Sequence, residues 1–200
     1  MPPLRIYDRL APVYDLLSAS ERPFRRRALG LLALTPADAF LEIGCGSGRD
    51  VALAAARARR AVGVDLAFLM LCAAQRRLKS APAALVQADA AALPFAPACF
   101  HAVYLSFTLE LLPPPVQQQA LAEARRVLAP GGRAAVVCLA RSERPGTAER
   151  IYGWFHRRFP RVVDCAPICP AQVLGEAGFA VLAREAGSLW RLPVEILLAG

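Results

Sequence analysis

The sequence predicts an α/β protein with a doubly wound, mostly parallel sheet of seven strands. Between residues 39 and 140, short apolar runs alternate with stretches of helix-forming residues, as in proteins that carry helices on both faces of a sheet. The runs are apolar almost throughout, which is typical of strands buried on both faces. The last two runs are separated only by GSLWRL, too short for a helical crossover, so they should pair antiparallel.

The elements follow in chain order. The first strand, AFLEI, is a short apolar run that ends in a glycine-rich turn, and helix formers follow it over 49–58. A second run, RAVGVD, precedes a helical stretch over 66–81. A further helix over 116–128 begins after three prolines and stops at the sequence PGG. The expected strands lie at 39–43, 60–65, 83–89, 101–107, 133–140, 179–186 and 193–199.

Composition limits the classes of protein that fit. With 200 residues, of which 56% are hydrophobic, the chain is expected to form a single domain over 1–200. Its net charge of +8 favours anionic partners, but no recognition-helix or RNA-binding signature accompanies the charge, so nucleic acid is not an expected partner. The six cysteines form no metal-binding pattern, and no metal is expected.

Targeting signals are the next consideration. The N-terminus lacks the apolar core of a signal peptide, and no apolar run reaches the roughly 18 residues of a membrane span. We therefore expect a cytoplasmic protein, with peripheral membrane contact left open.

The stretch LEIGCGSGRD carries the strongest functional signal. Its glycines, Gly44, Gly46 and Gly48, allow a ligand to approach the main chain without an intervening side chain. A phosphate-binding P-loop would need a Lys-Ser or Lys-Thr pair here, and a dinucleotide site would need glycine where Arg49 stands. Glu42 would repel a pyrophosphate but could attract an ammonium group, so the loop favours a ligand with a positive charge.

LEIGCGSG resembles the first motif of the class I S-adenosylmethionine-dependent methyltransferases, and further motifs follow in order over 37–140. VGVDLA resembles the second motif, VQADAAALPF the third and FHAVYLSFTLELL the fourth. EARRVLAPGGRAAVV resembles the helix, glycine turn and fifth strand of the type 11 methyltransferase domain common to quinone-biosynthesis enzymes. APVYD resembles the N-terminal cap of quinone and phospholipid methyltransferases. The resemblance implies a Rossmann-like fold, S-adenosylmethionine as cofactor and methyltransferase activity.

The resemblance also implies roles for individual residues. Asp65 would accept from the ribose hydroxyls, Asp89 would face the adenine amino group, and the backbone of Ala90 would face the ring edge. Glu42 suits the amino-acid end of the cofactor, and apolar side chains including Leu93 could enclose the adenine. The expected cofactor-binding residues are Glu42, Gly44, Cys45, Gly46, Gly48, Asp65, Leu66, Met70, Asp89, Ala90, Ser106 and Tyr14.

No catalytic residue is assigned, because in-line methyl transfer depends mainly on holding donor and acceptor in a dry pocket. His101 is expected at the amino edge of the sheet, in a structural role, and His156 at the surface. Phe107, next to Ser106, should lie near the cofactor. Thr108 and Glu110 could touch the acceptor, although solvent exposure at a helix start would explain Glu110 equally well.

The segment 147–163 bears on the acceptor. Ile151, Trp154, Phe155 and Phe159 fall on one helical face, with arginines on its flanks. A helix packed on the sheet edge is the interpretation we favour narrowly; the other is a basic, aromatic lid that rests on an anionic bilayer. We expect cap helices over 1–36 and a helical lid over 141–178.

The expected activity is methyl transfer to a small, lipophilic acceptor, either a quinone precursor or a lipid headgroup. The quinone enzymes carry an Asn-rich, His-containing motif after the Tyr-Asp pair, where this chain has LLSASERPFRRR. The alternative is a catalytically silent partner subunit that binds S-adenosylmethionine. A dehydrogenase is a distant third.

Overall fold

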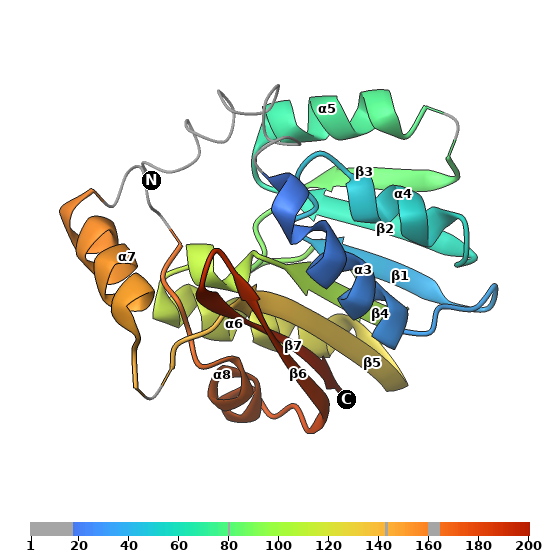
Figure 1. Cartoon of the computed structure of the whole chain (residues 1–200). Helices are drawn as coiled ribbons and strands as arrows, with labels where there is room; N and C mark the ends of the chain where they lie inside the picture. Colours follow the sequence, from blue (N-terminus) through green and yellow to red (C-terminus); the bar gives the residue numbers. More distant parts are fainter. Residues whose placement is uncertain (1–17, 80, 143, 160–164) are drawn as a thin grey trace.

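The computed structural model of the chain has a seven-stranded sheet with helices on both faces (Figure 1). It describes residues 18–79, 81–142, 144–159 and 165–200. The strand order is β3-β2-β1-β4-β5-β7-β6, and β7 runs antiparallel to both β5 and β6. The expected fold class is therefore confirmed. The strands are β1 (Ala39–Ile43), β2 (Arg60–Asp65), β3 (Ala83–Gln87), β4 (Phe100–Ser106), β5 (Leu128–Leu139), β6 (Val181–Leu189) and β7 (Leu192–Ala199).

Two sets of helices cover the two faces of this sheet. One cluster of buried apolar residues joins α3, α4 and α5 to one face, and a second cluster joins α6 and α8 to the other. Each face is thus sealed from water, which explains the continuous apolar runs in the central strands. The helices are η1 (Ser18–Glu21), α3 (Arg22–Leu31), α4 (Arg49–Ala55), α5 (Phe68–Arg77), η2 (Leu109–Leu111), α6 (Pro114–Val127), α7 (Thr147–Arg158) and α8 (Pro170–Glu176).

Most boundaries agree with the apolar runs, and β1 and β2 match residue for residue. The start of β5 was predicted wrongly, because Leu128 already pairs with Phe100 before a register shift. The proline and glycines after α6 end that helix but lie within the irregular first part of the strand. The strand β6 continues to Leu189, since the hairpin turn consists only of Trp190 and Arg191, both with positive φ.

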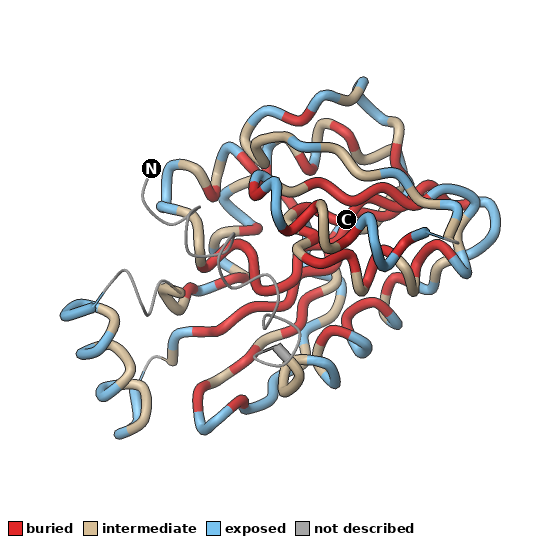
Figure 2. Tube along the Cα trace, turned by 90° about the horizontal axis from the view of Figure 1, so that it is seen from above, coloured by how far each residue is buried: buried red, intermediate tan, exposed pale blue. Residues whose placement is uncertain are grey.

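The segment 147–158 forms α7, but the helix contacts the body through a different face from the one expected. None of its residues is buried, and in Figure 2 it carries only intermediate and exposed positions. Ala148 and Tyr152 pack partly against the core, and the Tyr152 hydroxyl donates to the Cys165 carbonyl at 3.0 Å. The aromatic face of the helix is left in solvent.

Parallel strands bring their carboxyl ends to one edge of the sheet, and this positions the functional residues. The strand order reverses between β1 and β4, so the loops after these two strands diverge to opposite faces and leave a crevice between them. The loop after β1 is the glycine loop. At the opposite edge, Nδ1 of His101 accepts the Ala39 N–H at 3.1 Å, so this histidine lies at the amino ends of the strands, as expected.

Candidate functional site

A pocket lies at the carboxyl edge of the sheet, where the strand order reverses. Its walls come from the ends of β1, β2 and β4, from the loop after β3, and from the first turn of α5. It is therefore assembled by the fold and not by one local segment. The lining residues are Ile43, Gly44, Gly46, Val64, Asp65, Leu66, Ala67, Met70, Ala88, Asp89, Ala90, Ser106, Phe107, Thr108, Leu111 and Leu112.

The glycine loop presents bare main chain to this pocket. Gly44 has a φ of +74°, and its N–H donates to the Val64 carbonyl at 2.8 Å, which ties the loop to β2. A Cβ on Gly44 would lie 2.5 Å from Oγ1 and Cγ2 of Thr108. Both the backbone angle and the lack of space therefore require glycine at this position.

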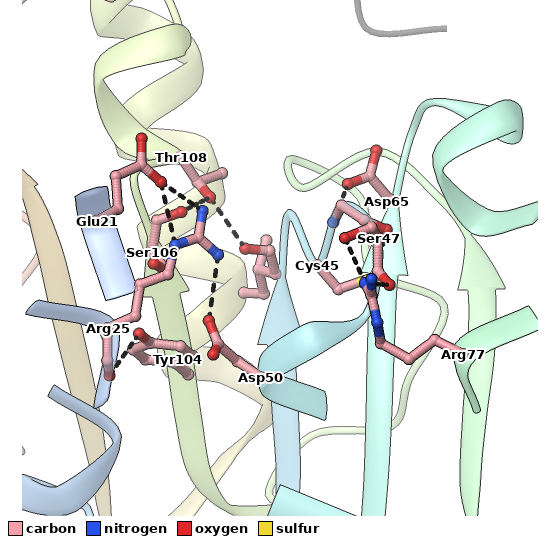
Figure 3. Close-up of polar contacts among 12 residues, drawn as sticks. Glu21, Arg25, Cys45, Ser47, Asp50, Asp65, Arg77, Tyr104, Ser106 and Thr108 are labelled. Carbon is pink, nitrogen blue, oxygen red and sulfur yellow. Dashed lines mark hydrogen bonds and ion pairs between the residues drawn. The ribbon is translucent and has the colours of Figure 1, made fainter. Parts of the chain in front are cut away.

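The carboxylate of Asp65, at the end of β2, is hydrogen-bonded to the glycine loop. Its Oδ2 accepts the Gly46 N–H at 2.7 Å (Figure 3), and its Oδ1 accepts the Ala67 N–H at 2.9 Å. A carboxylate oxygen can accept more than one hydrogen bond. Asp65 can therefore keep these contacts and also accept from a pair of hydroxyls on a ligand.

A second carboxylate, that of Asp89, lies on the far wall of the pocket. Its Oδ1 accepts the Ala91 N–H at 2.9 Å, which fixes the turn that also carries Ala90. Between the two carboxylates the wall is apolar, with Met70 buried and Leu66 partly exposed. The arrangement suits a flat heterocycle with an exocyclic amine, joined to a diol.

The pocket brings together most of the residues expected to bind the cofactor. Four of the described residues do not line it, namely Glu42, Cys45, Gly48 and Leu93. Cys45 faces Gly63 of β2, and Gly48 faces Ala74 of α5. Leu93 belongs to the core on the face of the sheet that α6 and α8 cover. Tyr14 is outside the described residues. The expected residues on the pocket wall are Gly44, Gly46, Asp65, Leu66, Met70, Asp89, Ala90 and Ser106.

Glu42 lies within the protein and not on the pocket wall. Its side chain is fully buried, and neither carboxyl oxygen has a hydrogen-bond partner among the described residues. Burial raises the pKa of Glu42 well above its ordinary value, and the nearby Asp50 carboxylate raises it further. Glu42 is not among the residues that line the pocket, so its expected contact with the amino-acid end of the cofactor stays a prediction.

A buried ion-pair network beside the loop was not predicted. Arg25 donates to Oε2 of Glu21 at 2.9 Å and to Oδ2 of Asp50 at 3.2 Å, so it connects η1 to α4 (Figure 3). The Tyr104 hydroxyl donates to the Arg25 carbonyl at 3.1 Å. The sequence showed only a basic stretch at this position, and no local pattern singles out Arg25 from its neighbours.

Arg77 supports the loop from α5, another contact that the sequence did not reveal. Its Nη1 lies 2.6 Å from both the carbonyl oxygen and the hydroxyl oxygen of Ser47 (Figure 3). The loop is therefore fixed on one side by Asp65 and on the other by Arg77. These contacts favour one loop geometry before a ligand binds, which lowers the cost of binding.

The side of the pocket next to β4 is mainly apolar. Phe107, with a φ of +49°, lines it together with Leu111 and Leu112. Thr108 also lines the pocket, which is consistent with the expectation that it could touch the acceptor. Its hydroxyl donates to the Ser106 carbonyl at 3.0 Å.

The possible exposure of Glu110 proves wrong. Only 1% of the residue is exposed, because η2 turns it under the end of β5, where its Oε1 accepts the Leu139 N–H at 2.9 Å. Burial raises the pKa of Glu110 to about 8.

His156, which was expected at the surface, lies on α7 and is half-buried.

Two features are absent from the described part of the chain. Within it, no group of three or more His, Cys, Asp or Glu side chains could hold a metal ion. Over the same residues, every helix is too short or too polar to cross a membrane.

The residues of the pocket fit S-adenosylmethionine. The main chain at Gly44 and Gly46 lines the pocket and suits the amino-acid portion, Asp65 suits the ribose diol, and Asp89 suits the adenine amine. Leu66 and Met70 offer apolar surface to the adenine ring.

Comparison with known proteins agrees with this fit. Residues 40–132 match the family model described as a methyltransferase domain. The chain is 36% identical over 168 residues to the ubiquinone/menaquinone biosynthesis C-methyltransferase UbiE of Syntrophotalea carbinolica, covering 78% of this chain and 69% of that protein. It is 31% identical over 204 residues to the demethylmenaquinone methyltransferase of Beutenbergia cavernae, covering 93% of this chain and 81% of the relative.

Solved structures share the fold at lower identity. The [4+2]-cyclase SpnF superposes with a TM-score of 0.76 at 17% identity, covering 100% of this chain and 96% of that one. A shared fold does not fix the reaction, so the assignment rests on the sequence relatives and the family model. The chain belongs to the class I S-adenosylmethionine-dependent methyltransferases.

Proposed function

We propose that the chain transfers a methyl group from S-adenosylmethionine to a lipophilic acceptor of the quinone-precursor class. The observation that carries this proposal is the apolar wall formed by Phe107, Leu111 and Leu112 on the side of the pocket next to β4. An acceptor ring against this wall would be shielded from water and close to the glycine loop. Relatives named for quinone methylation support the same class of acceptor.

The cofactor, when bound, supplies a methyl group that is already activated by a sulfonium centre. The chain's own residues would orient the cofactor and the acceptor, and they would exclude water from the pocket. Asp65 and Asp89 would hold the nucleoside, and the main chain at Gly44 and Gly46 would accommodate the amino-acid portion.

A general base is not part of this proposal. Beside the nucleoside carboxylates, the described polar side chains of the pocket wall are the hydroxyls of Ser106 and Thr108. A hydroxyl is a weak base near neutral pH, so the acceptor should bring its own nucleophilic atom. The carbon–sulfur bond of the donor methyl group would break as the new bond forms, S-adenosylhomocysteine would leave, and the proton of a methylated ring carbon would then pass to solvent. The electron-rich ring of a reduced quinone precursor meets this requirement, whereas the oxidised ring does not.

The experiment compares acceptors directly. The full chain is incubated with deuterated-methyl S-adenosylmethionine and either short-chain demethylmenaquinone, reduced or oxidised, or phosphatidylethanolamine, and products are identified by mass spectrometry. We expect label on the ring of the reduced quinone only. Label on the phospholipid would move the acceptor to the lipid-headgroup class. Tight binding of S-adenosylhomocysteine with no labelled product, from these acceptors or from a cell extract, would favour the silent partner subunit.

The same proposal includes contact of α7 with an anionic membrane surface. Ile151, Trp154, Phe155 and Phe159 are 44% to 54% exposed, and the ring centroids of Trp154 and Phe155 lie 5.0 Å apart. Arg150, Arg157 and Arg158 flank this aromatic face. An amphipathic helix with aromatic residues on one face and arginines beside them suits the interface of an anionic bilayer, where a lipophilic acceptor would reside.

The division of the chain also remains a proposal. A single domain over 1–200, with a cap over 1–36 and a lid over 141–178, would place η1 and α3 in the cap and α7 and α8 in the lid.

A further inference from the structure

A second, smaller cavity lies between α3 and α4. Its lining is dominated by arginine, contributed by both helices. The guanidinium of Arg25 lies over the ring of Phe107, 5.8 Å from its centroid, and Phe107 also lines the pocket described above. The two cavities are therefore neighbours at one edge of the sheet. The residues around the second cavity are Arg22, Arg25, Arg26, Arg49, Asp50 and Leu53.

Two of the arginine charges in this cavity, those of Arg22 and Arg26, are not balanced by a described carboxylate. Arg25 forms ion pairs with the carboxylates of Glu21 and Asp50. Among the described residues, Arg22 and Arg26 have neither an ion pair nor a side-chain hydrogen bond. Guanidinium groups gathered around one cavity repel each other, and an anion between them would relieve this repulsion.

The cavity is built on a fixed frame. Arg22, Arg25 and Arg26 are three and four residues apart, so they share one face of α3. Arg25 is itself buried and anchored through Asp50 to α4, and its carbonyl accepts the Tyr104 hydroxyl. Arg49 begins α4 on the opposite wall. Arg22 and Arg26, both exposed, therefore line the cavity beside a buried ion pair that joins α3 to α4.

We propose that this cavity binds a phosphate-type oxyanion, with Arg22 and Arg26 as the principal donors. Guanidinium groups form paired, charge-assisted hydrogen bonds with phosphate oxygens, and they do so better than other cationic side chains. The site goes beyond the proposed methyl transfer, because binding of the anion needs neither the cofactor nor an acceptor. The phosphate could belong to a soluble compound or to a phospholipid headgroup.

Calorimetry on the full chain tests the site with inorganic phosphate at constant ionic strength. We expect saturable binding to the wild type, weaker by about tenfold or more in the Arg22→Gln/Arg26→Gln variant, since two charge-assisted donors are lost. The matched control is Arg57→Gln/Arg59→Gln, which removes two exposed arginines beyond the other end of α4. It should bind phosphate within about twofold of the wild type.

A second titration with monomeric dihexanoyl phosphatidic acid separates the two sources of phosphate. Binding at least tenfold tighter than inorganic phosphate, and lost in the Arg22/Arg26 variant, would assign the site to a lipid headgroup. Comparable affinities would assign it to a soluble phosphate. The proposal is overturned if neither probe binds saturably, or if both double variants weaken binding equally. S-adenosylhomocysteine affinity, measured in parallel, keeps this result separate from the methyltransferase function.

Discussion

The Asp65 carboxylate accepts the main-chain N–H of Gly46, with 2.7 Å between Oδ2 and the nitrogen. This contact joins the end of β2 to the glycine loop that follows β1. Because the second oxygen accepts the N–H of Ala67 just before α5, one side chain orients both the loop and the start of that helix. The residue proposed to hold the ribose therefore also shapes the surface on which the rest of the cofactor would lie.

Asp65→Ala should weaken binding of S-adenosylhomocysteine by about 1 to 3 kcal/mol, since partners for two hydroxyls disappear and the loop loses a support. Isothermal titration calorimetry measures this change. Glu176→Ala, which removes a carboxylate from the exposed side of α8, is the control and should leave the dissociation constant as it is. An unchanged constant in the Asp65 variant would count against the proposed ribose site.

Gly44→Ala should lower cofactor affinity by at least tenfold and also destabilise the fold. The new Cβ would meet Thr108 at 2.5 Å, in a backbone conformation with φ of +74°. Gly30→Ala is the matched control, because Gly30 is exposed in α3 and a Cβ there meets nothing within 4 Å. The control should gain about 0.5 to 1 kcal/mol of stability from the better helix former. Thermal denaturation and calorimetry on both variants would contradict the requirement for glycine if Gly44→Ala behaved like the control.

Local patterns predicted β1, β2 and the pocket residues at their ends, because apolar runs and strand-end motifs depend on neighbouring residues only. The ion pair of Arg25 with Asp50 joins residues 25 positions apart, and the burial of Glu110 depends on β5, which follows later in the chain. Neither contact has a local signature. For α7 the periodicity identified the apolar face correctly, but periodicity alone does not tell whether protein covers that face.

Glu110→Gln should make stability less dependent on pH. The pKa of Glu110 is about 8 in the folded protein, against an ordinary value of 4.5. Between these values the folded protein retains a proton that the unfolded chain releases, so the contribution of Glu110 to stability falls as pH rises and levels off above about 8. The slope is at most about 1.4 kcal/mol per pH unit.

The amide oxygen of glutamine can still accept the Leu139 N–H, so the variant keeps this contact and loses only the titration. Urea unfolding from pH 5 to 9 gives the free energy of unfolding of both proteins. Glu42 and Glu21, whose pKa values are also raised, titrate in both and cancel in the difference. Equal slopes for the two proteins would show that Glu110 does not hold the proton.

Charge reversal on α7 should weaken membrane contact. Arg157→Glu/Arg158→Glu is expected to reduce binding to phosphatidylglycerol-containing vesicles, since each basic residue near an anionic surface contributes about 1 kcal/mol. Arg57→Glu/Arg59→Glu changes the net charge equally beyond the far end of α4 and is the matched control. Vesicle co-sedimentation over a range of salt concentrations measures both. Equal losses would mean that net charge, and not α7, governs the interaction.

The aromatic face gives an independent measurement, because apolar insertion does not depend on lipid charge. Trp154 is 54% exposed, so Trp154→Ala should leave the stability of the fold nearly unchanged while it reduces vesicle binding. The reduction should persist at high salt, where the contribution of the arginines is screened. If Trp154→Ala leaves partitioning unaltered while Arg157→Glu/Arg158→Glu reduces it, α7 meets the membrane through its charges alone. If neither variant changes partitioning, the aromatic face of α7 is not a membrane surface.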